Sequence, residues 1–123
     1  MKEGLILFAH GSREPEWALP FERIASELRK RFLVELAYLE RMNPTLDEAV
    51  ASAVTKGAQR VRIVPVFLGV GGHIKEDLPK LAGAARARHP GVEIVLETTI
   101  GEREEITQAI AAVISKGNSH QPR

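Results

Sequence analysis

The stretch RVRIVPVFLGVGGHIKEDLP, residues 60–79, decides the fold of this chain. Its first half is apolar and rich in β-branched residues, which predicts a buried strand at residues 61–67. Three glycines end this strand: Gly69, Gly71 and Gly72. Glycine lets the backbone turn sharply and lets a ligand approach closely. Because His73 follows directly, the stretch predicts a strand that delivers an imidazole to a glycine-rich loop.

A second predicted strand ends in the same way. Residues 4–9 read GLILFA, a short apolar strand, and His10 and Gly11 follow it. In open parallel α/β sheets, ligands bind at the carboxyl ends of the strands, where the strand order reverses. Two strands that each end in a histidine and a glycine-containing loop therefore predict one site shared by His10 and His73.

The rest of the chain alternates strands with helices. Further strands are predicted at residues 34–39 and 92–96, and helices at 17–32, 45–57, 75–89 and about 99–115. Strands that alternate with helices predict a parallel sheet with helices on both faces. Right-handed crossovers favour a doubly wound α/β domain of four strands in the order 2-1-3-4. In that order the first and third strands are neighbours, so the two histidines come to the same crevice.

Capping signals and apolar stripes define the predicted helices. Thr45 and Glu48 have the spacing of a capping box, and Thr99 and Glu102 repeat it. The last helix carries an apolar stripe along one side: Ile106, Ala109, Ile110, Val113 and Ile114. Residues 1–115 are therefore expected to form one domain. Residues 116–123 are polar and are expected to form a disordered tail.

Composition excludes several classes of function. The chain has 123 residues, which suffices for one domain, and its formal net charge is +1. This balance, with aromatic residues at 5%, argues against nucleic acid as a partner. There are no cysteines, which excludes disulfides and thiolate ligands and fits a cytoplasmic protein. No apolar run is long enough to span a bilayer, so no membrane partner is expected.

His10, His73 and Glu40 are the residues best suited to chemistry. Two imidazoles at one crevice can bind a divalent metal, or one can act as a general base. The alternative is that each histidine is an isolated loop residue bonded to the backbone. Glu40 ends the strand at 34–39, so it shares the same sheet edge. It could complete a two-histidine, one-carboxylate set, or it could be an ordinary exposed carboxylate.

Cationic and glycine-rich groups lie beside the same loops. Arg13, Arg41 and Lys75 could bind the carboxylates of an acidic ligand, although solvated surface charge is the usual alternative. The glycines could cradle a phosphate, but the chain contains no Walker loop and no G-x-G-x-x-G. The sequence G-x-S-x-G is also missing, so Ser12 is not expected to be a hydrolase nucleophile.

Four groups of residues together resemble a known family. They are HGSR at 10–13, YLE at 38–40 followed by Asn43-Pro44, PVFL at 65–68, and GHIKEDLP at 72–79. They are similar to the sirohydrochlorin chelatases of the CbiX type, over nearly the whole chain to about Ile114. The length resembles the small single-domain form, which matches one half of the longer two-lobed chelatases.

The resemblance implies a lyase-type metal chelatase. Such enzymes insert a divalent metal, cobalt, iron or nickel, into the tetrapyrrole sirohydrochlorin for cobalamin or sirohaem biosynthesis. The metal is then a substrate, and no tightly bound cofactor is expected. His10 and His73 would be metal ligands, one of them also taking pyrrole protons, with Glu40 assisting. The remaining implied site residues would bind the macrocycle: Ser12, Arg13, Arg41, Asn43, Leu68, Gly69, Val70, Gly71 and Gly72.

Two other readings of the sequence are kept beside this one. A non-catalytic metal or tetrapyrrole carrier could use the same fold, and it would differ from an enzyme only in turnover. A phosphate-binding receiver-like module is disfavoured, because it needs acidic residues where His10 ends the first strand. Because sirohydrochlorin is broad and flat and one small domain offers a shallow crevice, a homodimer with facing clefts is expected.

Overall fold

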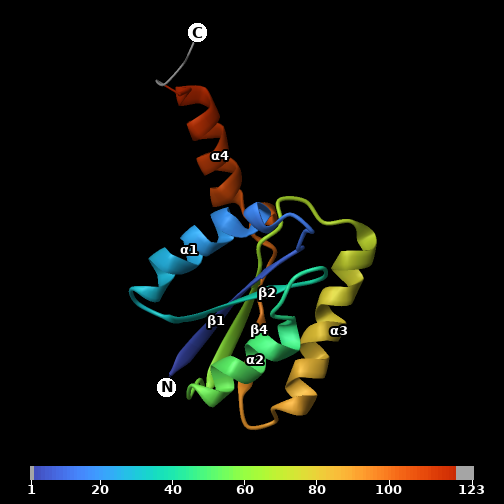
Figure 1. Cartoon of the computed structure of the whole chain (residues 1–123). Coiled ribbons are helices and arrows are strands. Elements are labelled where there is room, and N and C mark those ends of the chain that lie inside the picture. The colour runs from blue at the N-terminus through green and yellow to red at the C-terminus, as the bar shows by residue number, and fades with distance from the viewer. Residues whose placement is uncertain (1, 119–123) are drawn as a thin grey trace.

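A four-stranded parallel sheet organises the computed structural model, which describes residues 2–118 (Figure 1). The strands are β1 (Glu3–Ala9), β2 (Leu33–Tyr38), β3 (Arg60–Pro65) and β4 (Glu93–Leu96). Their order is β2-β1-β3-β4, and every neighbouring pair is parallel. The predicted doubly wound sheet and its strand order are confirmed. β1 lies at the centre, hydrogen-bonded to β2 on one side and to β3 on the other.

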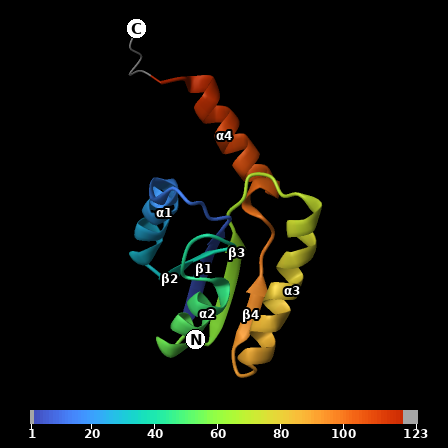
Figure 2. The ribbon, with the colours of Figure 1, turned by 45° about the vertical axis from the view of Figure 1, so that its right-hand side comes forward.

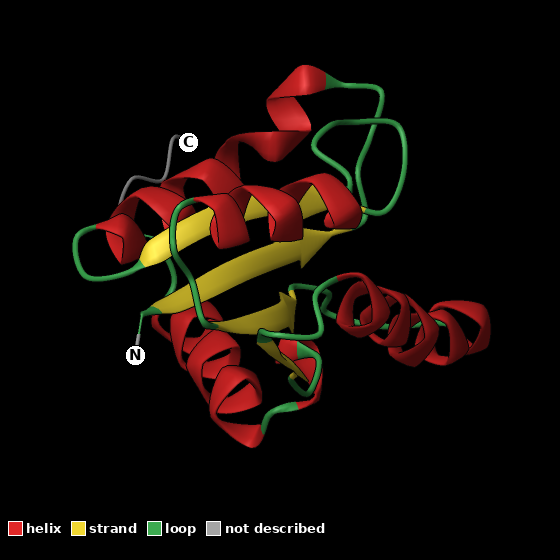
Figure 3. Cartoon of the chain, turned by 90° about the horizontal axis from the view of Figure 1, so that it is seen from below, coloured by secondary structure: helices red, strands yellow, loops and turns green. Residues whose placement is uncertain are grey.

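Helices cover both faces of this sheet (Figures 2 and 3). The helices are η1 (Pro15–Ala18), α1 (Leu19–Arg29), α2 (Leu46–Thr55), α3 (Gly72–Arg88), η2 (Ile100–Glu102) and α4 (Glu104–Lys116). η1 and η2 are short 3-10 helices. No helix in residues 2–118 is long and apolar enough to cross a membrane. Residues 119–123, most of the tail predicted to be disordered, lie outside the described residues.

Alternating side chains divide the core between the two faces, because successive residues of a strand point to opposite sides. Ile6, Phe8 and Ile63 pack with the buried side chains of α2 and α3. Leu5 and Leu7 point the other way and pack with Ala25 of α1. Each large apolar side chain buried in this way stabilises the fold by about 1.5–3 kcal/mol. Burial on both faces of β1 therefore fixes the register of its neighbours.

The start of α2 matches its predicted capping box. The Thr45 hydroxyl accepts a hydrogen bond from the Glu48 N–H at 3.2 Å, and the Glu48 carboxylate accepts one from the Thr45 N–H at 2.9 Å. The second predicted capping box, at Thr99 and Glu102, is wrong. The Thr99 side chain caps no helix, and η2 occupies residues 100–102 instead. Tertiary contacts explain this, because the Gly101 N–H donates to the carbonyl of Phe67 at 2.9 Å.

Helix boundaries also differ from the predictions near the site. α1 ends at Arg29, not at residue 32, because the chain turns there and brings Phe32 against the core. α3 begins at Gly72, three residues earlier than predicted. Extended backbone at Gly71 serves as its N-cap, and the Lys75 N–H donates to the Gly71 carbonyl at 3.1 Å. His73 therefore lies in the first turn of α3 and not in a loop.

α4 does not pack against the sheet of its own chain. It projects beyond the carboxyl edge of the strands (Figures 1 and 2), and none of its residues is buried. Ile110, Val113 and Ile114 of its predicted apolar stripe are 39%, 70% and 73% exposed. The stripe that the sequence indicates is present, but the described residues of this chain do not cover it.

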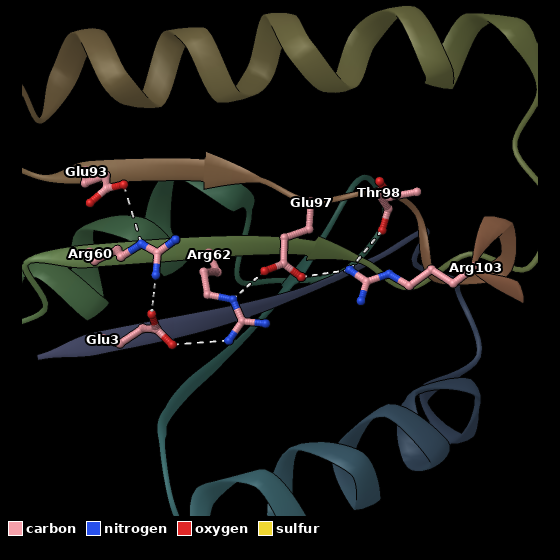
Figure 4. Close-up of polar contacts among 7 residues, drawn as sticks. All are labelled: Glu3, Arg60, Arg62, Glu93, Glu97, Thr98 and Arg103. Carbon is pink, nitrogen blue, oxygen red and sulfur yellow. Dashed lines mark hydrogen bonds and ion pairs between the residues drawn. The ribbon is translucent and has the colours of Figure 1, made fainter. Parts of the chain in front are cut away.

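Charged side chains of β1, β3 and β4, and of the segment that follows β4, form a network of ion pairs (Figure 4). We call them the sheet-face network: Glu3, Arg60, Arg62, Glu93, Glu97 and Arg103. Arg62 donates to Glu3 at 3.2 Å and to Glu97, and Arg103 donates to Glu97 at 2.8 Å. The hydrogen bond from Arg62, and after it that from Arg103, lowers the pKa of the Glu97 carboxyl, although burial opposes the shift.

This pKa shift makes the stability of the fold depend on pH. A carboxyl whose pKa is lower in the folded state stabilises the fold above its ordinary titration range, near 4.3, and this stability is lost as pH falls through the folded pKa. We expect Glu97→Gln to lower the free energy of unfolding by about 1–2 kcal/mol at neutral pH. The difference from the parent chain should shrink toward about pH 3, where the parent carboxyl is increasingly protonated.

Urea unfolding at both pH values measures this difference. Glu27→Gln is the matched control, because Glu27 pairs with Lys30 at 3.1 Å but both side chains are largely exposed. Such a surface pair contributes about 0–1 kcal/mol. An equal loss for Glu97→Gln at both pH values would contradict the assigned role of the charge.

Candidate active site

The pairing of β1 with β2 brings His10 against Glu40. Beyond the regular ladder, the Leu39 N–H donates to the Ala9 carbonyl at 2.9 Å, and the Glu40 N–H donates to the His10 carbonyl at 3.1 Å. The two segments that follow β1 and β2 therefore stay adjacent past the ends of these strands. As a result, His10 Nε2 lies 3.2 Å from Glu40 Oε2.

Gly11 makes this close approach possible. Its φ is +99°, and a Cβ built on it would lie 1.9 Å from the carbonyl oxygen of Glu40. A side chain would therefore collide with backbone that cannot move without disturbing the strand ends. Gly11 is needed both for its left-handed conformation and for the space it leaves.

Charge and exposure suit His10 and Glu40 to proton transfer. Their side chains are 44% and 49% exposed, so ligands and solvent reach them. Glu40 Oε2 also lies 3.5 Å from Nε of Arg41, so the carboxylate lies between an imidazole and a guanidinium group. With the imidazole proton on Nε2, that nitrogen donates to Glu40 and Nδ1 keeps a lone pair for a metal or a proton.

Phe67 holds the imidazole from the β3 side. The rings of His10 and Phe67 meet edge to face, with centroids 6.2 Å apart, and Phe67 meets Phe8 in the same way at 6.4 Å. Phe67 is only 8% exposed, so core packing fixes the ring against which the imidazole lies. The sequence predictions assigned no site role to Phe67. Its position as the last aromatic residue before the glycine-rich loop is the signal that could have indicated one.

The glycine-rich loop at residues 68–72 is open and is held at both ends by η2. Leu68 is 71% exposed, and a Cβ on Gly69, Gly71 or Gly72 would meet nothing within 4 Å. At one end, a Cβ on Gly101 would lie 1.8 Å from the Leu68 carbonyl oxygen. At the other end, Lys75 Nζ pairs with Glu102 Oε2 at 3.0 Å. Lys75, which the sequence suggested as a partner for an acidic ligand, is therefore paired with a carboxylate of its own chain.

The structure assembles part of the predicted site. His10 and Glu40 are in contact, whereas His73 is exposed in the first turn of α3. Within residues 2–118, no three histidine or acidic side chains form a group that could hold a metal. The predicted two-histidine, one-carboxylate set is therefore not preassembled in one chain.

The remaining predicted substrate-binding residues lie along the same edge. The Ser12 hydroxyl accepts a hydrogen bond from the Glu14 N–H at 3.0 Å, so it stabilises its own turn. Arg13 and Asn43 are exposed in the loops that follow β1 and β2, and Val70 is half-buried. Arg41 has a φ of 67°, which is unusual for a residue other than glycine. Its conformation keeps its guanidinium group beside Glu40.

The fold and this edge together define a class of protein. It is a doubly wound α/β domain with an imidazole, a carboxylate and a glycine-rich loop at the carboxyl ends of β1, β2 and β3, respectively, where such folds bind ligands. The model of the CbiX family matches residues 4–116. The chain belongs to the CbiX family.

Individual relatives agree with this assignment. A sirohydrochlorin cobaltochelatase of Saccharolobus solfataricus is 33% identical over 120 residues, which cover 92% of this chain and 94% of that protein. The crystal structure of a CbiX protein from Marinobacter aquaeolei, described as a putative cobalamin biosynthesis protein, has a TM-score of 0.81 at 33% identity. The match covers 93% of this chain and 95% of the Marinobacter chain.

One structural relative is about twice as long as this chain. The sirohydrochlorin chelatase SirB from Bacillus subtilis, solved in complex with cobalt, has a TM-score of 0.79 at 25% identity. The match covers 94% of this chain but 51% of that chain. The present domain therefore corresponds to about half of SirB.

The close contact at Gly101 yields a test of how the loop is held. We expect Gly101→Ala to lower the free energy of unfolding by about 1–3 kcal/mol, because the added methyl would push the Leu68 backbone away. Amide hydrogen exchange at residues 66–75 should become faster. Urea unfolding and hydrogen exchange measure the two effects.

Gly83→Ala is the matched control for the same substitution. Gly83 lies inside α3, and a Cβ there would meet nothing within 4 Å. This variant should gain about 0.5–1 kcal/mol, because alanine favours the helix, and it should leave the loop unchanged. Equal effects of the two substitutions would contradict the role assigned to Gly101.

Proposed function

We propose that this protein is a sirohydrochlorin chelatase that inserts a divalent metal, with cobalt as the main substrate metal. The observation that carries the proposal is the match to the CbiX family over residues 4–116, together with the cobaltochelatase relative similar over nearly its whole length. The product would serve cobalamin biosynthesis. Iron, on the way to sirohaem, and nickel are the alternative metals.

Imidazole ligands suit a metal that must be delivered and not stored. Imidazole nitrogen binds cobalt, nickel and iron, whereas thiolates would hold such metals more tightly. The chain has no cysteine, and His10 and His73 are both accessible. We infer that these two histidines present the metal to the macrocycle. The metal is consumed as a substrate, so the proposal requires no resident cofactor.

Insertion of the metal also requires the removal of two pyrrole protons. His10 is positioned for this step, because Glu40 contacts one ring nitrogen and stabilises the imidazolium that forms when the other takes a proton. Arg41 stabilises the carboxylate in turn. A base that contacts both solvent and the site can pass each proton to water before the next is taken.

The macrocycle itself needs a broad surface and cationic partners. The side-chain-free positions at Gly69, Gly71 and Gly72 leave room for a flat ring over the loop. Exposed Arg13 and Arg41 suit the carboxylates at its rim, because guanidinium groups bind carboxylates through two parallel hydrogen bonds. We assign this loop and these arginines to substrate binding.

A second copy would complete the site. His73 of one chain lies apart from the pair formed by His10 and Glu40, and half of SirB corresponds to the present domain. We therefore propose a homodimer in which two sheet edges face each other across a shared cleft. A closed two-fold pair is the commonest way in which such chains assemble.

The test of the proposed function follows the absorbance of sirohydrochlorin mixed with Co²⁺, Ni²⁺ or Fe²⁺, with and without protein. We expect the protein to accelerate insertion of Co²⁺. His10→Ala and His73→Ala should each lower the rate by about 10²-fold or more, because a ligand or base is removed from the reacting centre. Both variants should keep the far-ultraviolet circular dichroism of the parent chain.

His89→Ala is the matched control, because His89 follows α3 at the end opposite to His73. Its rate should equal that of the parent chain. Near-normal rates in both site variants would refute the assignment of the histidines. Stoichiometric binding of sirohydrochlorin without faster insertion would instead indicate a carrier.

A further inference from the structure

Phe67 occupies the position beside His10 in the register of β1 and β3. Phe8 is paired with Pro65 in this ladder, and the Val66 N–H continues the pairing by donating to the Phe8 carbonyl at 2.8 Å. Two residues further along both segments, the same parallel register places Phe67 next to His10. Because side chains alternate along a strand, His10 lies on the face of the sheet that carries Phe8, and Phe67 packs on that face too.

Two contacts of different kinds hold the imidazole of His10. On the β2 side, Glu40 Oε2 lies 3.2 Å from Nε2, and on the β3 side the Phe67 ring meets the imidazole at 81° with the centroids 6.2 Å apart. The hydrogen bond alone would leave the imidazole free to turn about the line that joins its two atoms, because the outer torsion of histidine has only broad preferences. The ring of Phe67 removes this freedom, since a turned imidazole would collide with it or lose the edge-to-face contact.

Phe67 is itself fixed by the core and by its own backbone. Its ring meets that of Phe8, which is 1% exposed, edge to face at 6.4 Å. Its carbonyl accepts a hydrogen bond from the Gly101 N–H at 2.9 Å, so the same residue also holds η2. The side chain of His10 is 44% exposed and has no comparable packing of its own. The orientation of an exposed imidazole therefore depends on a buried neighbour that cannot move with it.

We propose that Phe67 is a positioning residue for the reaction. Its ring fixes the plane of the His10 imidazole, so that Nε2 stays on Glu40 and Nδ1 stays available to the metal or to a pyrrole proton. Phe67 acts through His10 and needs no contact with the substrate. The catalytic consequence rests on the proposed function. An imidazole that turns freely spends little time in the reactive orientation, so the chemical step slows while the binding of the macrocycle is unchanged.

Two other roles would also place a buried phenylalanine at this position, and each predicts a different result. A residue that only fills the core would lower stability when it is replaced, but it would leave the order of the His10 ring unchanged. A residue that lines the surface for the macrocycle would raise KM when it is replaced, because it contributes to binding in the ground state. The positioning role alone predicts a looser His10 ring together with a lower kcat.

Carbon-13 relaxation of the histidine rings measures the positioning without turnover. In the parent chain we expect the His10 ring to have an order parameter of about 0.85, as in rigid backbone, and in Phe67→Leu we expect it below about 0.6. Phe32→Leu is the matched control, because it removes the same kind of ring from the core cluster of Leu5 and Leu7 on the opposite face. This control should leave the His10 ring ordered. Equal order of the ring in Phe67→Leu and in the parent chain would overturn the proposal.

Steady-state insertion of Co²⁺ into sirohydrochlorin tests the catalytic consequence. Phe67→Leu should lower kcat by about tenfold and leave KM for the macrocycle within about twofold. Phe67→Met removes the flat ring but keeps a long apolar side chain that adapts to the core, so it should act in the same way and replaces the leucine variant if that chain does not fold. Phe32→Leu should keep both constants. A raised KM with an unchanged kcat would indicate a macrocycle contact instead and would overturn the proposal.

The two measurements separate this inference from the proposed function. A parent chain that inserts no metal would refute the proposed function, while a His10 ring loosened by Phe67→Leu would still support the positioning contact. Metal insertion with the same kcat in Phe67→Leu and in the parent chain would overturn the catalytic role of Phe67, and would leave the chelatase activity standing.

Discussion

The parallel hydrogen bonding of β1 to both β2 and β3 is the constraint on which the rest of the structure depends. The register of these ladders ends the three strands at one edge, so the residues that follow them become neighbours. This register aligns His10, Glu40 and Phe67 at that edge. A slip of one residue in either ladder would turn the strand's core side chains to the opposite face and separate these three groups.

Two glycines convert this alignment into close contact. Gly11 lets the backbone at Glu40 lie against the turn after β1, and Gly101 lets η2 lie against the backbone of Leu68. Both contacts join a backbone to a backbone, so a side chain at either position would force apart elements that the sheet holds in place. The imidazole and the glycine-rich loop are therefore supported by rigid backbone even though both face solvent.

The two faces of the sheet differ in what covers them. The face shared by α2 and α3 is filled with apolar side chains, whereas the β3–β4 half of the other face has paired charges. The apolar stripe of α4 is unfavourable in water, because Ile110, Val113 and Ile114 stay exposed.

The sequence by itself determined the parallel sheet, its strand order, the capping box of α2 and the sheet edge at which His10 and Glu40 lie. These follow from local periodicity and from the handedness of crossovers, which neighbouring residues encode. Only the tertiary structure decided that His10 contacts Glu40 while His73 stays apart, that η2 replaces a capped helix start, and that α4 leaves the sheet. Those outcomes depend on contacts between residues far apart in the chain, such as Gly101 with Phe67 and Leu68, which no local pattern records.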